Sequence, residues 1–246
     1  MKKIGCFLSH LLLFLSACCP TWADTISSSE NSRLIIAPYA WALNMSGTIG
    51  LSGIDVPLNL QSTELLSGVK SGGMGYAQWQ SEGWFIYLEG IFIDFGEKNF
   101  APLFNQSVDA LLLFAESGGG VNLDLAQGIR VSPYLGVRLI KLQVDVKGPL
   151  LHQTVEQEWV DPVAGALVNV PLTTRVSWVT KADAGGFNVN NNNYQSVATL
   201  LVYDINRRWS MGAGYRYANF DASDSGNGLT MDLEGHGPMA GLQVSF

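Results

Sequence analysis

The histidines are the first residues whose side chains could do chemistry, and one of them has an acid close by. The sequence has three histidines: His10 lies in an apolar N-terminal stretch, His152 in a polar segment, and His236 follows Glu234 in the run EGHGPM. A histidine-dependent hydrolase also needs a nucleophilic hydroxyl or thiol beside the histidine, and EGHGPM contains none. The sequence therefore predicts no catalytic site, and we expect the chain not to be an enzyme.

Motifs for metals and cofactors are absent from the sequence. All three cysteines fall before residue 20, and isolated histidines do not make a zinc site, which takes several ligands. The NNNN run at 190–193 lacks the alternating carboxylates of a calcium loop. The SGGG run at 117–120 lacks the lysine that follows a phosphate-binding loop. We therefore expect no metal ion and no cofactor.

Charged side chains recur on one parity of segments whose other parity is apolar. In RVSWVTKADAGG, residues 175–186, Trp178 and its parity are apolar or small, whereas Lys181 and Asp183 lie on the opposite parity. Both signs of charge occur at such positions, so a salt-bridge network is feasible, and a buried charge needs a partner. The candidate members of one polar network are Glu89, Arg138, Lys141, Asp161, Lys181, Asp183 and Arg216.

A closed antiparallel sheet would turn these side chains toward one interior. Apolar and small or polar residues alternate with a period of two, which indicates strands. Ten strands are predicted, an even number as in bacterial membrane barrels: residues 35–45, 71–80, 84–95, 107–123, 134–146, 160–172, 175–185, 196–204, 210–221 and 229–246. The glycine-rich stretch 115–133 is ambiguous, and its loss or the merger of two neighbours would leave eight strands.

The inward face distinguishes a membrane barrel from a soluble secreted sandwich, which is the alternative fold. Charged residues make up only 14% of the chain, against about 25% in soluble domains. Small residues mixed with charges suit a narrow lumen, so the bulky apolar face is assigned to lipid. On the first strand this assignment places Tyr39 and Trp41 outside. On strand 134–146, Arg138 and Lys141 can both face inward only if a bulge lies near Leu139.

Turn lengths also alternate along the chain. Residues 81–83, 173–174 and 205–208 form tight turns, whereas the loops at 47–70, 96–106, 147–158, 186–195 and 222–228 are longer. Outer-membrane barrels keep their short turns in the periplasm, and both termini are predicted at that end. Trp84, Trp209 and Phe246 lie there too, as an interfacial aromatic girdle would. In the first long loop, STELLSG at 62–68 fits either a helical turn or an ordinary loop.

The N-terminus has the features of an export signal. Lys2 and Lys3 precede an apolar stretch that ends near a predicted cleavage point after Ala23. The run LSAC at 15–18 offers an alternative in which Cys18 is lipidated. The expected divisions are a signal peptide at 1–23, a disordered lead-in at 24–33 and a barrel at 34–246. The formal net charge of −7 argues against a nucleic-acid partner.

The chain ends in GPMAGLQVSF, which alternates like a strand. We expect it to pair with the first strand, because only closure satisfies every backbone group in lipid. Leu242 is assigned to the lipid face and Gln243 to the lumen. Leu242, Val244 and Phe246 are the candidate assembly signal.

Several segments carry a resemblance to a known group of proteins. WVDPVAG (159–165), DAGGF (183–187), GYRY (214–217) and the final GPMAGLQVSF resemble a largely uncharacterised family of bacterial outer-membrane β-barrels, and APYAWALNMSGTIG is similar to its first strand. We expect a monomer in the outer membrane of a Gram-negative bacterium, in contact with outer-membrane lipid. The resemblance implies insertion by the barrel-assembly machinery through a C-terminal strand that ends on Phe246. It implies no particular activity.

Three functions remain open on the sequence. The first is a structural or narrow-pore role that passes small solutes. The second is surface interaction or adhesion through the long loops, in which APLF at 101–104 is apolar. The third is a lipid-modifying barrel enzyme, for which the residues around His236 offer no nucleophile.

Overall fold

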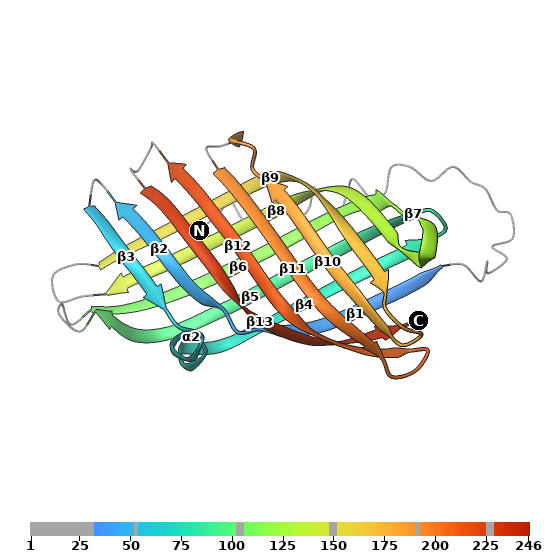
Figure 1. The fold of residues 1–246 in the computed structure, drawn as a ribbon. Coiled ribbons are helices and arrows are strands. Elements are labelled where there is room, and N and C mark those ends of the chain that lie inside the picture. The colour runs from blue at the N-terminus through green and yellow to red at the C-terminus, as the bar shows by residue number, and fades with distance from the viewer. Residues whose placement is uncertain (1–31, 52–53, 102–105, 148–151, 190–191, 225–228) are drawn as a thin grey trace, which may run out of the picture. The chain divides into compact units, whose positions relative to one another are not determined.

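One antiparallel β-sheet forms most of the described part of the computed structural model (Figure 1). The structure describes residues 32–51, 54–101, 106–147, 152–189, 192–224 and 229–246. All of them belong to the second of the two units of the chain, Asn31–Phe246. The predicted signal peptide, the alternative lipidation at Cys18 and most of the lead-in lie outside the described residues.

Ten strands close the sheet into a barrel, as the sequence predicts. The last strand pairs with the first, with Ile35 opposite Ser245 and Ala40 opposite Ala240, so the predicted closure is confirmed. In order around the barrel the strands are β1 (Arg33–Trp41), β4 (Val69–Ser81), β5 (Trp84–Ala101), β6 (Gln106–Val121), β8 (Arg130–Lys147), β9 (His152–Pro171), β10 (Val176–Gly185), β11 (Asn192–Asp204), β12 (Trp209–Asp224) and β13 (Leu229–Ser245).

The outer surface of the barrel carries an apolar band. On β5, Trp84, Ile86, Leu88 and Phe92 are exposed, and the residues of the opposite parity between them are buried. Asp94 continues the outward row, so the apolar band on this strand ends between Phe92 and Asp94. A transmembrane β-strand crosses the bilayer in about ten residues, and every second one faces lipid. The outward apolar row from Trp84 to Phe92 has this length.

Most of the predicted face assignments hold. On β13, Leu242 is half-exposed on the outside, and Gln243 lies opposite buried Ser210, as predicted. The first strand differs from its prediction, because Tyr39 and Trp41 of β1 point into the lumen. Bulky aromatics were assigned to lipid, but a narrow lumen must also be filled, and aromatic rings fill it well.

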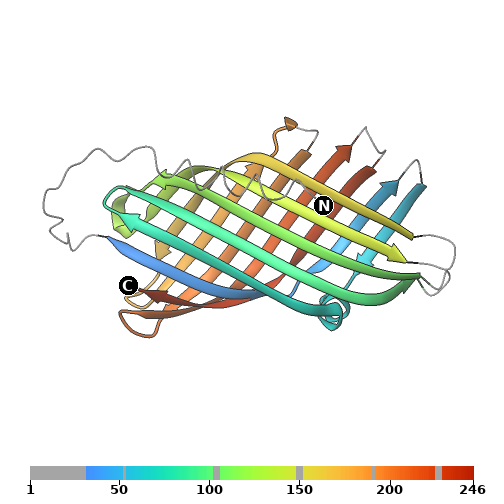
Figure 2. The ribbon, with the colours of Figure 1, turned by 180° about the vertical axis from the view of Figure 1, so that it is seen from behind.

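The strands continue beyond the apolar band, so most of the predicted long loops are strand. A hairpin of β2 (Asn44–Leu51) and β3 (Ile54–Leu60) occupies the first long loop and extends the sheet along Leu229–His236 of β13. The helix α2 (Ser62–Gly68) follows, directly precedes β4, and contacts β5 and β2 (Figure 2). Its N-cap is Gln61, whose N–H donates to Glu64 Oε2 at 3.0 Å, so the helical alternative for STELLSG is confirmed with a different cap.

The opposite end of the barrel, here called the short-turn rim, carries the tight turns and both strand ends Arg33 and Ser245. The β4–β5 turn uses Gly83 at φ 77°, a conformation that glycine adopts without strain. Thr173 Oγ1 accepts the N–H of Val176 at 3.0 Å, and Asn206 Oδ1 accepts that of Trp209 at 3.0 Å. Side-chain oxygens of this kind stabilise tight turns.

A fourth connection at this rim links β6 to β8. It contains β7 (Leu123–Asp124), which pairs with β8, and the short 3-10 helix η1 (Ala126–Gly128). The glycine-rich stretch is therefore strand β6 followed by a compact turn, and the count stays at ten. No helix in the described part of the chain is long and apolar enough to cross a membrane.

Candidate functional site

Three neighbouring strands place charged side chains directly beside one another inside the barrel. Glu89 of β5 lies opposite Glu116 of β6, and Glu116 lies opposite Arg138 of β8. All three are buried, with Arg138 at 0% exposure. Two carboxylates in adjacent positions repel each other, so this arrangement needs cations from elsewhere in the barrel.

Lys181 of β10 supplies one such cation from the other side of the lumen. Its Nζ lies 2.6 Å from Glu89 Oε2 and 2.9 Å from Glu116 Oε1. Strands β8 and β9 lie between β10 and β6, and β6 also lies between β10 and β5, so these contacts bridge the interior and are not made between neighbouring strands. The lumen is therefore narrow enough at this level for one lysine to span it.

The ion pairs of Arg138 are the most deeply buried ones of the network. Its Nε donates to Glu116 Oε2 at 2.8 Å, its Nη2 pairs with the same carboxylate, and Nη2 lies 2.6 Å from Asp183 Oδ1. The guanidinium also stacks 3.7 Å from the centre of the Tyr194 ring. A planar guanidinium can serve two carboxylates and an aromatic face together, which suits arginine to this position.

Arg216 of β12 completes the charge balance. Its Nη1 lies 2.7 Å from Glu89 Oε1 and 3.4 Å from the hydroxyl of Tyr39. Arg138, Lys181 and Arg216 thus face Glu89, Glu116 and Asp183, three cations against three carboxylates. Pairing of this quality is what makes buried charges tolerable, since each unpaired one costs several kcal/mol.

Tyrosine hydroxyls supply further donors to the same carboxylates. Tyr39 donates to Glu89 Oε1 and Tyr87 to Glu116 Oε1, each at 2.8 Å, and Tyr134 donates to Asp183 Oδ2 at 3.3 Å. The sequence analysis missed these tyrosines and also Glu116. Parity would have found Tyr87, which lies two residues before Glu89, and Glu116, which shares its parity with buried Phe114.

Asp161 lies inside the barrel but outside the ion-paired group. It is 1% exposed and opposes Arg138 in the β8–β9 ladder, yet that guanidinium turns to Glu116 and Asp183. Its partner is Asn192, whose Nδ2 donates to the two carboxylate oxygens at 3.3 and 3.5 Å. Among the described residues Asp161 forms no ion pair.

Lys141 does not face the lumen, which corrects the prediction. The register between β6 and β8 is continuous, without the bulge expected near Leu139, so Lys141 has the opposite parity to Arg138. Its Nζ pairs on the outside with Glu156 Oε1 at 2.5 Å. The strand has left the apolar band at this point, and polar residues therefore occur on its outer face.

Apolar layers enclose the charged network from both ends. On β5 the inward residues run Phe85, Tyr87, Glu89, Ile91 and Ile93, so the charge lies between an aromatic layer and an aliphatic one. Toward the short-turn rim, Phe85 and Tyr87 pack with other buried residues, Tyr134 and Val163. Toward the long-loop end, Ile91 and Ile93 join Phe114, Ile140, Trp159, Tyr194, Ala218, Ala222 and Met231. The barrel interior is a packed core.

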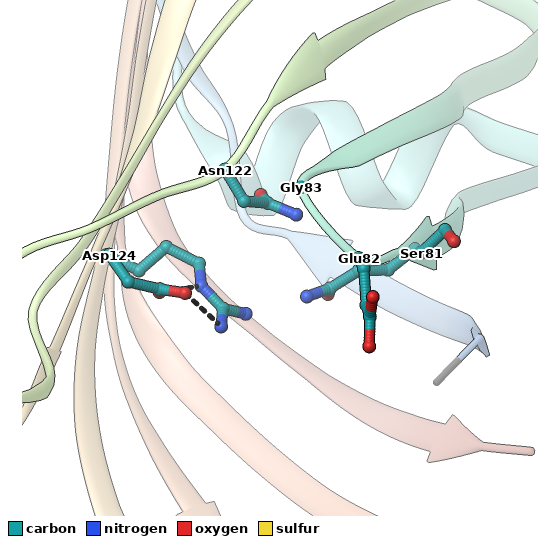
Figure 3. Close-up of a pocket in the computed structure, with 7 residues that line it drawn as sticks. Ser81, Glu82, Gly83, Asn122 and Asp124 are labelled. Atoms are coloured by element: carbon teal, nitrogen blue, oxygen red, sulfur yellow. Dashed lines mark hydrogen bonds and ion pairs between the residues drawn. The ribbon is translucent and has the colours of Figure 1, made fainter. Parts of the chain in front are cut away.

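A shallow polar hollow lies on the short-turn rim. It is lined by the β4–β5 turn around Glu82 and by the β6–β8 connection, with Asn122 and Asp124 opposite that turn (Figure 3). Arg130 Nε pairs with Asp124 Oδ1 at 2.6 Å. The hydrogen bonds from Arg130 hold the pKa of Asp124 below its usual range. The arginine in this hollow is thus already matched by a carboxylate.

His236 is the one histidine whose side chain the structure describes. It faces outward on β13, where its Nδ1 lies 2.6 Å from the hydroxyl of Tyr215 and the two rings stack. The side chain of His152 lies outside the described part. No group of three or more metal-ligating side chains occurs among the described residues.

The closed antiparallel sheet of ten strands and its apolar outer band define the fold class, a transmembrane β-barrel. No protein-family model matches the sequence, and no curated protein is significantly similar to it. The resemblance noted in the sequence is supported at the level of the fold. Its individual sequence motifs have no support from these comparisons.

Solved structures provide the particular likenesses. The outer membrane protease OmpT from Escherichia coli is 11% identical with a TM-score of 0.57, over 91% of this chain and 99% of that one. The translocator domain of the autotransporter NalP from Neisseria meningitidis is 13% identical with a TM-score of 0.43, over 90% of each chain. Neisserial surface protein A is 14% identical with a TM-score of 0.39, over 88% of this chain and 100% of that one. At these identities the likeness shows the fold alone.

Proposed function

We propose that the protein is a non-conducting outer-membrane barrel that anchors a structural or binding surface at its long-loop end. The observation that carries the proposal is the contact of Lys181 with Glu89 and Glu116 across the lumen, at 2.6 and 2.9 Å. A single side chain that spans the interior leaves no continuous path for a solute. A barrel of this size is normally filled by its own side chains.

The packing around the charges supports the same conclusion. A conduit would require water at the level of Arg138, but this guanidinium is wholly buried between two carboxylates and a tyrosine ring. Opening the path would break ion pairs and expose the aromatic layer below, and each unpaired buried charge costs several kcal/mol. Of the structural role and the narrow-pore role that the sequence predicts, the narrow-pore role is therefore the less favoured.

We infer that the protein acts at the surface of the cell. Strands β5, β6, β8, β9, β12 and β13 continue past the apolar band, and the β2–β3 hairpin adds to them. Exposed carboxylates mark this outer region, among them Glu158, Asp221, Asp232 and Glu234. With the short-turn rim in the periplasm, these groups lie outside the cell. A surface contact is the role that such an extended end supports.

We assign no catalytic activity to the barrel. The protease activity named for OmpT belongs to that protein, and a shared fold does not carry it over. His236 has a tyrosine hydroxyl as its bonded neighbour, and among the described residues no serine, cysteine or carboxylate is bonded to its ring. The proposal therefore keeps the expectation that the chain is not an enzyme.

Planar-bilayer recording tests the proposal. The purified protein is expected to insert without discrete current steps at any voltage, because the charged layer and its two apolar neighbours close the lumen. Insertion is verified independently by protease protection in the same lipid. Discrete steps that change with Lys181→Ala but not with Lys141→Ala, which alters only the outside of β8, would contradict the proposal and establish a pore lined by Lys181.

A further inference from the structure

Three arginines gather on two neighbouring turns of the short-turn rim. Arg175 ends the β9–β10 turn, and Arg207 and Arg208 lie in the β11–β12 turn. The N–H of Asp204 donates to the carbonyl of Arg175 at 2.8 Å, which places the two turns side by side. All three arginines are exposed. We call Arg175, Arg207 and Arg208 the rim arginines.

The rim arginines have no carboxylate partner in the described part of the chain. Asp204, the acid that precedes the second turn, accepts a bond from Ser210 Oγ at 2.7 Å and forms no ion pair there. Arg130 at the same rim differs, because Asp124 pairs with it at 2.6 Å (Figure 3). One part of the rim therefore carries arginines without an ion-pair partner among the described residues, and at another part the arginine is paired.

Apolar and aromatic side chains surround the rim arginines. Trp209 follows Arg208 directly. Five large side chains on this side of the barrel are between 42 and 52% exposed: Leu172, Trp178, Tyr203, Ile205 and Trp209. Exposed tryptophan and tyrosine at the end of an apolar band mark the membrane–water interface. The rim arginines thus lie at the depth of the lipid headgroups, where a phosphate can reach them.

We propose that the rim arginines form a binding site for the headgroup of an anionic phospholipid in the inner leaflet of the outer membrane. Guanidinium groups bind phosphate oxygens in a two-pronged geometry, and basic clusters beside apolar surface recognise anionic headgroups. A zwitterionic lipid carries its own cation next to the phosphate, so it gains less from three arginines. Cardiolipin, which has two phosphates, matches the cluster best.

The site is local to this part of the barrel. At the long-loop end the outer face carries carboxylates such as Glu158, Asp232 and Glu234, which repel an anionic lipid. Acyl chains attached to a headgroup at the rim arginines would lie along the exposed side chains of Trp178 and Trp209. The inference does not depend on whether the lumen conducts.

Thermal unfolding in the presence of defined lipids tests the site. The purified barrel in uncharged detergent micelles receives cardiolipin or phosphatidylcholine at equal phosphate content. Cardiolipin is expected to raise Tm by about 2–4 °C for the wild type, and phosphatidylcholine is expected to raise it by less than half as much. The combined variant Arg175→Gln, Arg207→Gln, Arg208→Gln is expected to lose most of the cardiolipin shift, and Arg130→Gln is expected to keep it.

Three outcomes would overturn the proposal. The combined variant could show the full cardiolipin shift, phosphatidylcholine could raise Tm as much as cardiolipin, or inorganic phosphate could reproduce the shift without any lipid. If the combined variant does not fold, the wild type still decides the matter. Its cardiolipin shift must fall as salt is added, because exposed charges are screened within about 10 Å at 0.1 M salt, and a shift that is independent of salt would contradict an arginine site.

Discussion

Replacing Arg138 by alanine is expected to lower the free energy of unfolding of the barrel by about 3–5 kcal/mol. The variant leaves Glu116 and Asp183 buried without the guanidinium that bonds to both. It also removes the cation that stacks on Tyr194. Urea unfolding of the protein in lipid vesicles, followed by tryptophan fluorescence, measures the change.

Lys141→Ala is the matched control, since Lys141 lies on the same strand three residues further along. Its ion pair with Glu156 lies on the outer face, where water and salt screen it. We expect a far smaller loss of stability than for Arg138→Ala. Equal losses for the two variants would mean that the interior charges contribute no more than surface ones.

Deleting Phe246 is expected to leave export intact and to reduce insertion strongly, so that the chain accumulates in the periplasm. The N–H of Phe246 donates to the carbonyl of Leu34 at 2.9 Å, and its carbonyl accepts from the N–H of Leu34 at 3.1 Å. These two bonds extend the ladder that closes the barrel, and the ring is exposed where the apolar band ends. The measurement is the ratio of membrane-bound to periplasmic protein in fractionated cells.

Gln243→Ala is the control for this deletion. Gln243 faces the lumen of the same strand and contributes nothing to the outer surface, so its membrane-to-periplasm ratio is expected to equal that of the wild type. If deletion of Phe246 leaves the ratio unchanged, the proposed assembly signal of Leu242, Val244 and Phe246 is wrong. The same holds if Gln243→Ala has the larger effect.

The alternation of apolar and polar residues predicted the barrel and the inward position of the charged residues on β10. On β10, Trp178 is exposed and Lys181 and Asp183 are inside, as their parity indicates. The pattern identified the faces there because both charged residues of β10 have one parity and Trp178 has the other. On this strand the charged residues mark the inward face.

The pattern failed where a strand leaves the apolar band or where the lumen is apolar. Lys141 is polar because β8 has already passed out of the lipid, so its parity carried no information about the lumen. Tyr39 and Trp41 are bulky because they fill the lumen beside Arg216. The side chain that an inward position needs depends on the width of the barrel at that level, which no single strand reveals.

The tyrosine donors and the lengths of the strands were hidden for a related reason. Tyr87 and Tyr134 are part of the aromatic layer and of the charged layer at once, and only their distances to Glu116 and Asp183 show the second role. The β2–β3 hairpin lies in a stretch rich in glycine and proline, such as Gly50 and Pro57, which favours a loop in isolation. Pairing with β13 overrides this preference.

Closure of the sheet between β1 and β13 is the central claim, because the sealed lumen and the place of Phe246 both depend on it. Ala40 and Ala240 are direct partners in that ladder, and both are exposed on the outside. Paired residues of this kind have Cα atoms about 5.5 Å apart, within the range that a disulfide spans. The three natural cysteines all lie before residue 20.

Oxidative cross-linking of Ala40→Cys with Ala240→Cys in the inserted protein tests this closure most directly. We expect near-complete disulfide formation, seen as altered mobility of the boiled, non-reduced chain and as loss of free thiols. Ala40→Cys with Ala213→Cys is the control, because Ala213 lies on the far side of Ala240, one strand further from Ala40. Cross-linking no greater in the first pair than in the control would contradict a barrel closed by its first and last strands.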